Sequence, residues 1–393
     1  MEKKIVLVSG VRTAIGEFLG GLSTINQIDL GGMVVAEAIK RAGIDPTLVD
    51  EVIVGNVGQV AESGFIGRAV MLRGGLPLET TAYSINRQCA SGLQAITDGA
   101  LKIITGYADV IVACGTESMS QIPYYIKNAR TGLRMGHQQL EDGLTDLLTW
   151  PLGPYHNGMT AEAVAEKFNI SREDQDIFAL NSQRKAIEAI DNGKFKEEIL
   201  PITTQQKKET ITIDTDEHPR RGLTIEKLAK LSPAFKPGGT VTAANSSGIC
   251  DGAAAVVLMQ EEKAQELGCH PLMEVVDFAI VGNEPELMGF APALSTKKLL
   301  KKLGMKIDDI DLIELNEAFA SQSLAVMRDL NLDPEKVNVN GGAIALGHPV
   351  GATGCILPVK MMYEMKRTGA RLGLVTLCVG GGQGMSVLFK NLQ

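Results

Sequence analysis

Aromatic side chains are scarce in this chain of 393 residues, of which Phe, Tyr and Trp together make up 4%. Stacking platforms for nucleic-acid bases are therefore not expected. The net charge is −8, and no basic run is long enough to hold a phosphate backbone, so a nucleic-acid partner is excluded. No apolar stretch reaches membrane-spanning length, and no membrane partner is expected. A ligand rich in phosphate would need a local patch of positive charge.

Cysteine pairs are also lacking, because the six cysteines lie far apart, with no C-x-x-C motif and no zinc-ligand spacing. We therefore expect free thiols and no metal site. A strand-like run begins at Ile5 and leaves no room for a targeting peptide, and the C-terminus, Asn391–Gln393, is not a peroxisomal signal. The sequence predicts a cytoplasmic protein.

Glycine, by contrast, is abundant, and its positions reveal an internal repeat. Ala38–Asn56 and Leu299–Glu317 each run from a basic helix end through a glycine and an aspartate into an apolar strand. A second pair of similar segments, Gly106–Gly115 and Gly369–Gly380, follows at nearly the same offset. Matching spacing over consecutive elements predicts a duplicated α/β domain, in which each copy is a sheet flanked by helices.

The two copies are separated by a segment that has no counterpart in the second half. We predict an N-terminal domain of residues 1–120 plus 242–270, an inserted loop domain of residues 121–241, and a C-terminal domain of residues 271–393. The insert contains a predicted helix, Ser171–Ile190, whose Ser-x-x-Asp start is typical of a helix N-terminus.

Cys89 lies between a predicted strand, Thr81–Ile85, and a predicted helix whose apolar residues have helical spacing and which stops at Gly106. The free N–H groups and the positive dipole end of a helix N-terminus favour a thiolate. We therefore expect a lowered thiol pKa at Cys89, which becomes a candidate nucleophile. A buried cysteine at a tight turn is the alternative.

His348 lies in a loop of glycine and alanine, "NVNGGAIALGHPVGATG", with few large side chains near it. Structural histidines usually pack on an apolar face or cap a helix, whereas this loop would hold the ring in an open cavity close to a ligand. We therefore interpret His348 as functional. Its loop and that of Cys89 occupy corresponding halves of the duplication, so they should meet and form a Cys–His pair.

Cys378, in "LCVGGGQG", ends what reads as the last strong strand. The three glycines lack the Lys-Ser/Thr of a phosphate-binding loop and the helix of a dinucleotide fingerprint. Another strand end, "ELNEAFA", carries Asn316 and Glu317. An amide there could hold a water or donate to an oxyanion, but a simple turn explains it equally well. We interpret the remaining cysteines as structural: Cys114, Cys250, Cys269 and Cys355.

Four motifs together resemble those of the thiolases, enzymes that make or break β-ketoacyl-CoA thioesters. They are "NRQCASGLQAI" around Cys89, "GGAIALGHPVGATG" around His348, "CVGGGQG" at Cys378 and "NEAFA" at Asn316. The resemblance covers essentially the whole chain, including the duplication and the inserted loop domain. It implies a five-layer αβαβα sandwich built from the two α/β domains.

The resemblance also implies a role for each residue of the catalytic site. Cys89 would be the nucleophile that becomes acylated, and His348 the base that activates it. Cys378 would take the α-proton of the incoming acetyl-CoA. Asn316, through a bound water, would join His348 in stabilising the enolate oxygen. The backbone N–H groups of Cys89 and Gly380 would form a second oxyanion hole.

By the same resemblance, coenzyme A thioesters are the substrates and no cofactor is required. Arg220, in "DEHPRRG", would meet the nucleotide and supply the local positive charge. Ser247, in "NSSGICDGAA", would touch the pantetheine arm. The other pocket-lining positions that the resemblance implies are Leu144, His156, Phe235, Ala243, Met288, Ala318 and Phe319.

The segment "RTGLRMG…DGLTD" resembles the tetramerising loop of the biosynthetic subgroup, which forms acetoacetyl-CoA from two acetyl-CoA and catalyses the reverse thiolysis. A homotetramer, a dimer of dimers, is therefore expected. The stretch between Gly136 and Asp142 is short, and the one before His156 is long. Asn157-Gly158 stands where that subgroup commonly has Met-Gly. A degradative 3-ketoacyl-CoA thiolase acting on longer chains is the alternative.

Three other classes of protein are disfavoured. A decarboxylating ketosynthase of the same superfold would carry histidine at the position of Cys378. A non-catalytic acyl-CoA-binding relative would be expected to lose Cys89, His348 or Cys378, and all three are present. A nicotinamide dehydrogenase would need a glycine fingerprint in its proper context.

Overall fold

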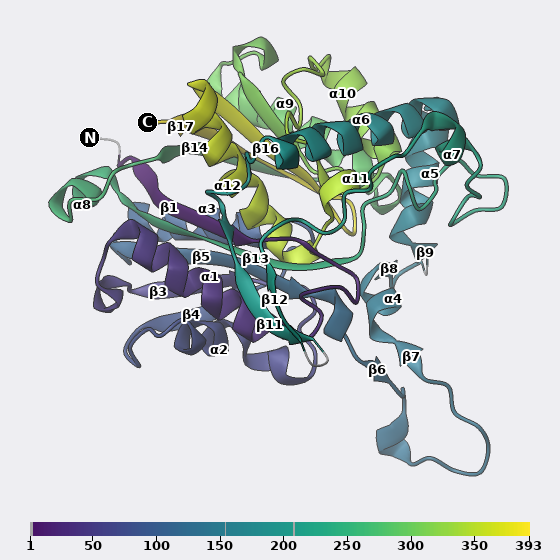
Figure 1. Cartoon of the computed structure of the whole chain (residues 1–393), viewed down its shortest axis with the longest axis horizontal. Coiled ribbons are helices and arrows are strands. Elements are labelled where there is room, and N and C mark those ends of the chain that lie inside the picture. Colours follow the sequence, from purple (N-terminus) through teal and green to yellow (C-terminus); the bar gives the residue numbers. More distant parts are fainter. Residues whose placement is uncertain (1–2, 154, 207–208) are drawn as a thin grey trace.

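A single mixed sheet runs through the molecule, and each half of the chain supplies about half of it (Figure 1). The computed structural model describes residues 3–153, 155–206 and 209–393. Within those residues the sheet has 11 strands, and β10 (Ile199–Leu200) and β2 (Gly16–Glu17) lie off its main path. The strand order along that path is β15 (Leu312–Leu315), β16 (Leu372–Val379), β17 (Gln383–Asn391), β14 (Met273–Gly282), β1 (Ile5–Thr13), β13 (Cys250–Gln260), β5 (Val110–Ser118), β3 (Glu51–Gly55) and β4 (Thr81–Ile85).

Helices cover both faces of this sheet, and its central strands are buried along their whole length. Every residue of β1 and of β5 is buried, as expected for strands between two helical layers. One pair of helices packs on the outer face of the N-terminal half, a second pair on that of the C-terminal half, and a third pair lies between the halves. These pairs are α1 (Gln27–Ala42) with α2 (Ile66–Arg73), α9 (Ala291–Leu303) with α10 (Ala320–Leu330), and α3 (Ser91–Ile104) with α12 (Val350–Thr368). The αβαβα layers agree with the prediction.

The predicted duplication is visible in equivalent turns. Gly43 ends α1 and Gly304 ends α9, both in the left-handed conformation, with φ of 70° and 66°. The carboxylate of Asp50 accepts two backbone N–H groups at the start of β5, at 2.7 and 3.0 Å. Asp311 does the same at the start of β16, with both bonds at 2.9 Å. One sequence pattern therefore fixes the same strand entry twice.

The strand that carries Cys378 is not the last one, in contrast to the sequence-based interpretation. β17 follows the glycine turn and pairs antiparallel with both β16 and β14 in the middle of the C-terminal half. Three glycines before β17 and the nearby chain end hid its pattern, although β17 is buried along most of its length. Cys378 therefore lies at a hairpin, opposite Gly384.

Most of the helices and short hairpins formed by the segment between β5 and β13 lie at one end of the sandwich, whereas its strand β10 pairs with β1 (Figure 1). The predicted helix is α6, Arg172–Asp191, and its capping box between Ser171 and Asp174 is present as expected. The domain boundaries themselves remain predictions. The other short elements of the chain are β6 (Tyr124–Tyr125), β7 (Glu141–Asp142), α4 (Gly143–Leu147), β8 (Thr149–Trp150), β9 (Tyr155–His156), α5 (Asn157–Lys167), β11 (Ile202–Gln206), β12 (Glu209–Ile213), α7 (Ile225–Ala229), α8 (Glu261–Glu266) and α11 (Ala343–Leu346).

Among the residues that the structure describes, no helix combines the length and the apolar character that crossing a membrane would demand.

Candidate active site

A sharp turn presents Cys89 between the end of β4 and the start of α3. Gln88, just before it, has φ +44°, a left-handed conformation that is strained for a residue with a side chain. Ser91 holds this turn from both sides: its hydroxyl accepts the N–H of Arg87 at 2.9 Å and donates to the carbonyl of Gln88 at 2.7 Å. The placement of Cys89 at the helix N-terminus therefore agrees with the sequence.

The protonation state of Cys89 differs from the expected thiolate. Burial is the largest influence and raises the pKa of this thiol to about 11, because a buried thiolate loses its hydration. The backbone N–H groups of Gly380 and of Cys89 itself lower the pKa, whereas the charge of Glu117 raises it. At neutral pH Cys89 is therefore a thiol, and it needs a base to become a nucleophile.

His348 is the candidate for that base, and it is buried rather than held in an open cavity. Burial lowers its pKa to about 4, so the ring is neutral at pH 7. The amide nitrogen of Asn316 lies 3.4 Å from Nε2 and can only donate, so Nε2 is the unprotonated nitrogen. Nδ1 then donates to the hydroxyl of Thr353, 2.6 Å away, which itself donates to the carbonyl of Pro349 at 2.9 Å. The free lone pair of a general base is therefore on Nε2.

Asn316 also has a free acceptor. Its Oδ1 is buried and has no hydrogen-bond partner among the described residues. A buried amide oxygen without a partner is costly unless a water or ligand group donates to it. Asn316 and His348 therefore share one polar spot.

Cys378 reaches the same place from the other half of the chain. It is fully buried in an apolar cluster, and this burial raises the pKa of its thiol, with a further increase from the charge of the Cys89 thiolate. The N–H of Gly380, two residues later, donates toward the sulfur of Cys89. Val350, which follows His348 by two residues, packs in one apolar cluster with Cys89. The two cysteines, the histidine loop and the glycine turn therefore meet where the two halves of the chain face each other.

Glu117, at the end of β5, ties these segments together and was not found from the sequence. Its buried carboxylate accepts backbone N–H groups of Val57, Gly58 and Gly351 at 2.9–3.0 Å, and the amide of Asn56 at 3.0 Å. Burial raises its pKa to about 7 despite these bonds, which lower it. Because Gly351 lies in the first turn of α12, Glu117 fixes the helix that follows His348.

Most of the predicted pocket residues line one side of this centre. The ring of His156 stacks on Phe235 at 5.0 Å between centroids, and Phe235 meets Phe319 edge-on at 6.1 Å. Phe319 belongs to the apolar cluster that holds Cys378, together with the other predicted residues Met288 and Ala318. Leu144 packs instead in the cluster around Cys89. Ser247 is joined to the same wall, since its N–H donates to the carbonyl of Ala318 at 3.0 Å.

The two remaining predicted residues, Arg220 and Ala243, line a separate cavity of about 260 Å³. The side chain of Arg220 is largely exposed and pairs with Glu17 at 3.3 Å, while its backbone N–H donates to Gln183 at 2.8 Å. Lys227 lines the same cavity. Two cations at the rim make this cavity suited to an anionic ligand.

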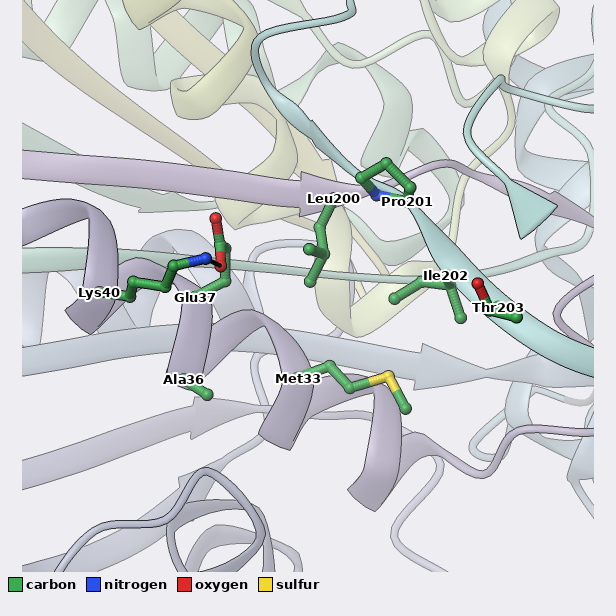
Figure 2. A pocket seen from close by; sticks show the side chains of 8 residues that line it. All are labelled: Met33, Ala36, Glu37, Lys40, Leu200, Pro201, Ile202 and Thr203. Atoms are coloured by element: carbon green, nitrogen blue, oxygen red, sulfur yellow. Dashed lines mark hydrogen bonds and ion pairs between the residues drawn. The ribbon is translucent and has the colours of Figure 1, made fainter.

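Another cavity, of about 300 Å³, lies between α1 and the strands β10 and β11 and is shown in Figure 2. Met33 and Ile202 give it apolar walls, and Lys40 pairs with Glu37 at 3.1 Å along one side. It shares no residue with the clusters around Cys89 and Cys378. We assign no part of the active site to it.

Taken together, the chain is a duplicated α/β sandwich with two cysteines and a histidine buried where its halves meet. Family models agree: the thiolase N-terminal domain matches residues 5–262 and the thiolase C-terminal domain residues 269–391. The chain therefore belongs to the thiolase family, and it is an acyltransferase.

Individual relatives are similar along their whole length. An acetyl-CoA acetyltransferase of Syntrophomonas wolfei is 48% identical, with 100% of both chains covered. The crystal structure of the Bacillus anthracis acetyl-CoA acetyltransferase has a TM-score of 0.98 at 43% identity, covering 100% of this chain and 99% of the other. That of human mitochondrial 3-ketoacyl-CoA thiolase has a TM-score of 0.96 at 41% identity, with the same coverage.

Proposed function

We propose that this enzyme catalyses the Claisen condensation of two acetyl-CoA to acetoacetyl-CoA and CoA, and the reverse thiolysis. The observation that carries the proposal is the meeting of Cys89 and Cys378 at one glycine turn, beside a neutral His348. The names of acetyl-CoA acetyltransferase relatives support acetyl-CoA as the substrate. Coenzyme A thioesters and the side chains of the site suffice for the reaction proposed.

The first half-reaction acylates Cys89. Nε2 of His348 takes the thiol proton, and the sulfur attacks the thioester carbon of acetyl-CoA. The developing oxyanion accepts N–H groups of Cys89 and Gly380. As the tetrahedral intermediate collapses, the CoA thiolate leaves and takes a proton from Cys378. The products are acetyl-Cys89, CoA, a protonated His348 and a Cys378 thiolate.

The second half-reaction uses the charges that the first one leaves. The Cys378 thiolate takes an α-proton from the second acetyl-CoA, and its raised pKa makes it the stronger base for this task. The enolate oxygen is stabilised by His348, now protonated at Nε2, and by Asn316. The enolate carbon attacks acetyl-Cys89, the Cys89 thiolate leaves, and His348 returns its proton. All three groups regain the neutral state in which the structure has them.

We further propose that the nucleotide of CoA binds at the cavity of Arg220 and Ala243. The pantetheine arm would run past Ser247, whose backbone is bonded to Ala318 beside Cys378. This path connects an exposed cationic rim to a buried apolar centre, which matches a ligand with a charged head and a thioester end.

A homotetramer is part of the same proposal. β4 is an edge strand of the sheet, with one side unpaired among the described residues, and such edges favour pairing with another chain. The hairpin of β6 and β7 projects away from the body (Figure 1) and carries the exposed side chains of Leu133, Met135 and Leu140. These two surfaces support a dimer of dimers.

Six free cysteines support a cytoplasmic location.

Removal of each cysteine tests the catalytic assignment. Cys89→Ala should form no acyl-enzyme at all. Cys378→Ala should still become acylated by acetyl-CoA, but slowly, and should neither condense nor exchange the acetyl α-protons with deuterium from the solvent. Intact-protein mass spectrometry measures the adduct, and NMR measures the exchange. An adduct on Cys378, or normal exchange in Cys378→Ala, would overturn the assigned roles.

The alternative substrate range is that of a 3-ketoacyl-CoA thiolase acting on longer chains. The structural likeness to the human mitochondrial 3-ketoacyl-CoA thiolase supports this alternative. Thiolysis rates across acyl chain lengths distinguish them. A rate that falls steeply beyond acetoacetyl-CoA supports the biosynthetic substrate, and a rate that holds for longer chains supports the degradative one.

A further inference from the structure

The single tryptophan of the chain, Trp150, lies against the glycine turn between β16 and β17. A Cβ atom built on Gly381 would be 2.8 Å from Cζ3 of Trp150 and 3.4 Å from Cη2. The six-membered ring of the indole therefore rests on the backbone of Gly381, with no side chain between them. Gly381 has φ +83°, which a residue with a Cβ would adopt only under strain.

The turn is held from outside at each of its glycines. Gly380 faces the side chain of Gln88, beside Cys89, with the nearest atom 3.4 Å from a built Cβ. Gly382 faces Asn283, whose N–H donates to its carbonyl at 2.6 Å. Trp150 covers the middle position. Three consecutive glycines have much conformational freedom, so the geometry of this turn depends on such neighbours.

The position of this turn matters because of what it carries. The N–H of Gly380 donates toward the sulfur of Cys89, and Cys378 precedes it by two residues. A shift of the turn would therefore move an oxyanion donor and a catalytic thiol together. Positioning errors of about 1 Å at such groups cost about 100-fold in rate.

Trp150 is itself well fixed. It lies in β8, which pairs with β9 through Trp150 and Tyr155 and through Thr149 and His156. His156 stacks on Phe235, which packs against the apolar cluster that contains Cys378. On the other side, Leu147 and Leu148 precede β8 and pack against the cluster around Cys89. The strand that presents the indole is thus anchored to both halves of the active site.

We propose that Trp150 is a positioning residue of the thiolase reaction, whose indole holds the Gly380–Gly382 turn in the geometry that receives the thioester oxygen. The inference rests on the proposed roles of Cys89 and Gly380. Trp150 touches no reacting atom in this assignment, so its removal should slow acylation without weakening the binding of acetyl-CoA.

The test compares Trp150→Ala, Trp150→Phe and a control, Leu152→Ala, whose side chain lies two residues further on and is 85% exposed. Single-turnover acylation by acetyl-CoA, followed by intact-protein mass spectrometry, should fall about 100-fold in Trp150→Ala, the loss typical of one oxyanion donor. The apparent KM for acetyl-CoA should change less than about threefold. Trp150→Phe keeps a ring over Gly381, so its acylation rate should fall by less than about tenfold. Leu152→Ala should react like the wild type.

A second readout separates positioning from a general loss of structure. Alkylation of Cys89 by iodoacetamide at pH 8 should slow about tenfold in Trp150→Ala, because the N–H of Gly380 no longer stabilises the thiolate. In the wild type, acylation should shift the emission of this single tryptophan, and Cys89→Ala should show no shift. The emission result stands even if Trp150→Ala fails to fold.

Three outcomes would overturn the inference: acylation of Trp150→Ala at the wild-type rate, a loss confined to KM, or unchanged tryptophan emission in a fully acylated wild type. A wild-type enzyme that forms no adduct on Cys89 would instead refute the proposed function, whatever the behaviour of Trp150.

Discussion

The hydroxyl of Thr353 lies 2.6 Å from Nδ1 of His348 and fixes which nitrogen of the ring is free. Thr353→Val keeps the shape of the side chain but leaves the Nδ1 proton buried without an acceptor, so the ring no longer prefers the reactive tautomer. We expect acylation of Cys89 to slow about 100-fold, within the range for a misdirected general base. Single-turnover acylation with acetyl-CoA measures the effect.

Thr353→Ser is the matched control, because it retains the hydroxyl that accepts from Nδ1 and donates to Pro349. Its acylation rate should stay within a few-fold of the wild type. Equal rates in the valine and serine variants would show that Thr353 has no part in orienting His348.

The neutral state of Cys89 can be measured directly. Because burial raises the pKa of this thiol to about 11, the thiolate fraction should still be increasing about tenfold per pH unit between pH 8 and 10. Alkylation by iodoacetamide, measured in Cys378→Ala during brief exposure to each pH, should follow that rise. A small thiol alkylated under the same conditions provides the reference, because its pKa lies near the ordinary value for a thiol. A plateau at Cys89 below pH 9 would support the thiolate that the sequence suggested.

Glu117 should make stability depend on pH in a definite direction. Its carboxyl ionises near pH 4.5 when unfolded and near pH 7 when folded, so the folded chain holds the extra proton between these values. Stability relative to Glu117→Gln should therefore fall as the pH rises from 4.5 to 7, by up to about 3 kcal/mol, and stay level above pH 7. Urea unfolding of both proteins across this range gives the difference. A constant difference would contradict the raised pKa.

Local chemistry explains why some of the site could be found from the sequence. Cys89 and His348 stand out because glycine and alanine surround them where bulky core residues would be usual. The equivalent roles of Asp50 and Asp311 show that the internal repeat also specified the register of the fold. These signals involve residues close together in the chain, so a sequence can reveal them.

The parts that were missed depend on tertiary structure. The donors around Glu117 come from the loop after β3 and from the start of α12, far apart in the chain. In the sequence, Thr353 looks like an ordinary helical threonine. Only the folded structure places its hydroxyl against the ring of His348. The thiolate prediction at Cys89 was wrong for the same reason: the helix N-terminus is a local feature, whereas the desolvation that outweighs it comes from the whole fold.

Arg220 and Arg221 allow a matched test of the proposed CoA site. Arg220 lines the cavity with Ala243, whereas the neighbouring Arg221 pairs with Asp191 and does not line it. Arg220→Ala should raise the KM for acetyl-CoA several-fold and leave that for acetyl-pantetheine nearly unchanged, since only the former carries the nucleotide phosphates. Arg221→Ala should change neither value. Equal increases in KM for both substrates in Arg220→Ala would show that Arg220 has a structural role.

The projecting hairpin should determine the size of the assembly. At its base, the hydroxyl of Tyr125 bonds to Asp146, and Lys127 pairs with Glu141, so the tip can be shortened without loss of these contacts. Replacing residues 128–138 with a two-glycine turn removes the exposed apolar side chains Leu133 and Met135. Light scattering should then report a dimer in place of a tetramer, because the edge strand β4 is untouched. A monomer at micromolar concentration in the intact protein, or a tetramer in the shortened one, would contradict this assembly.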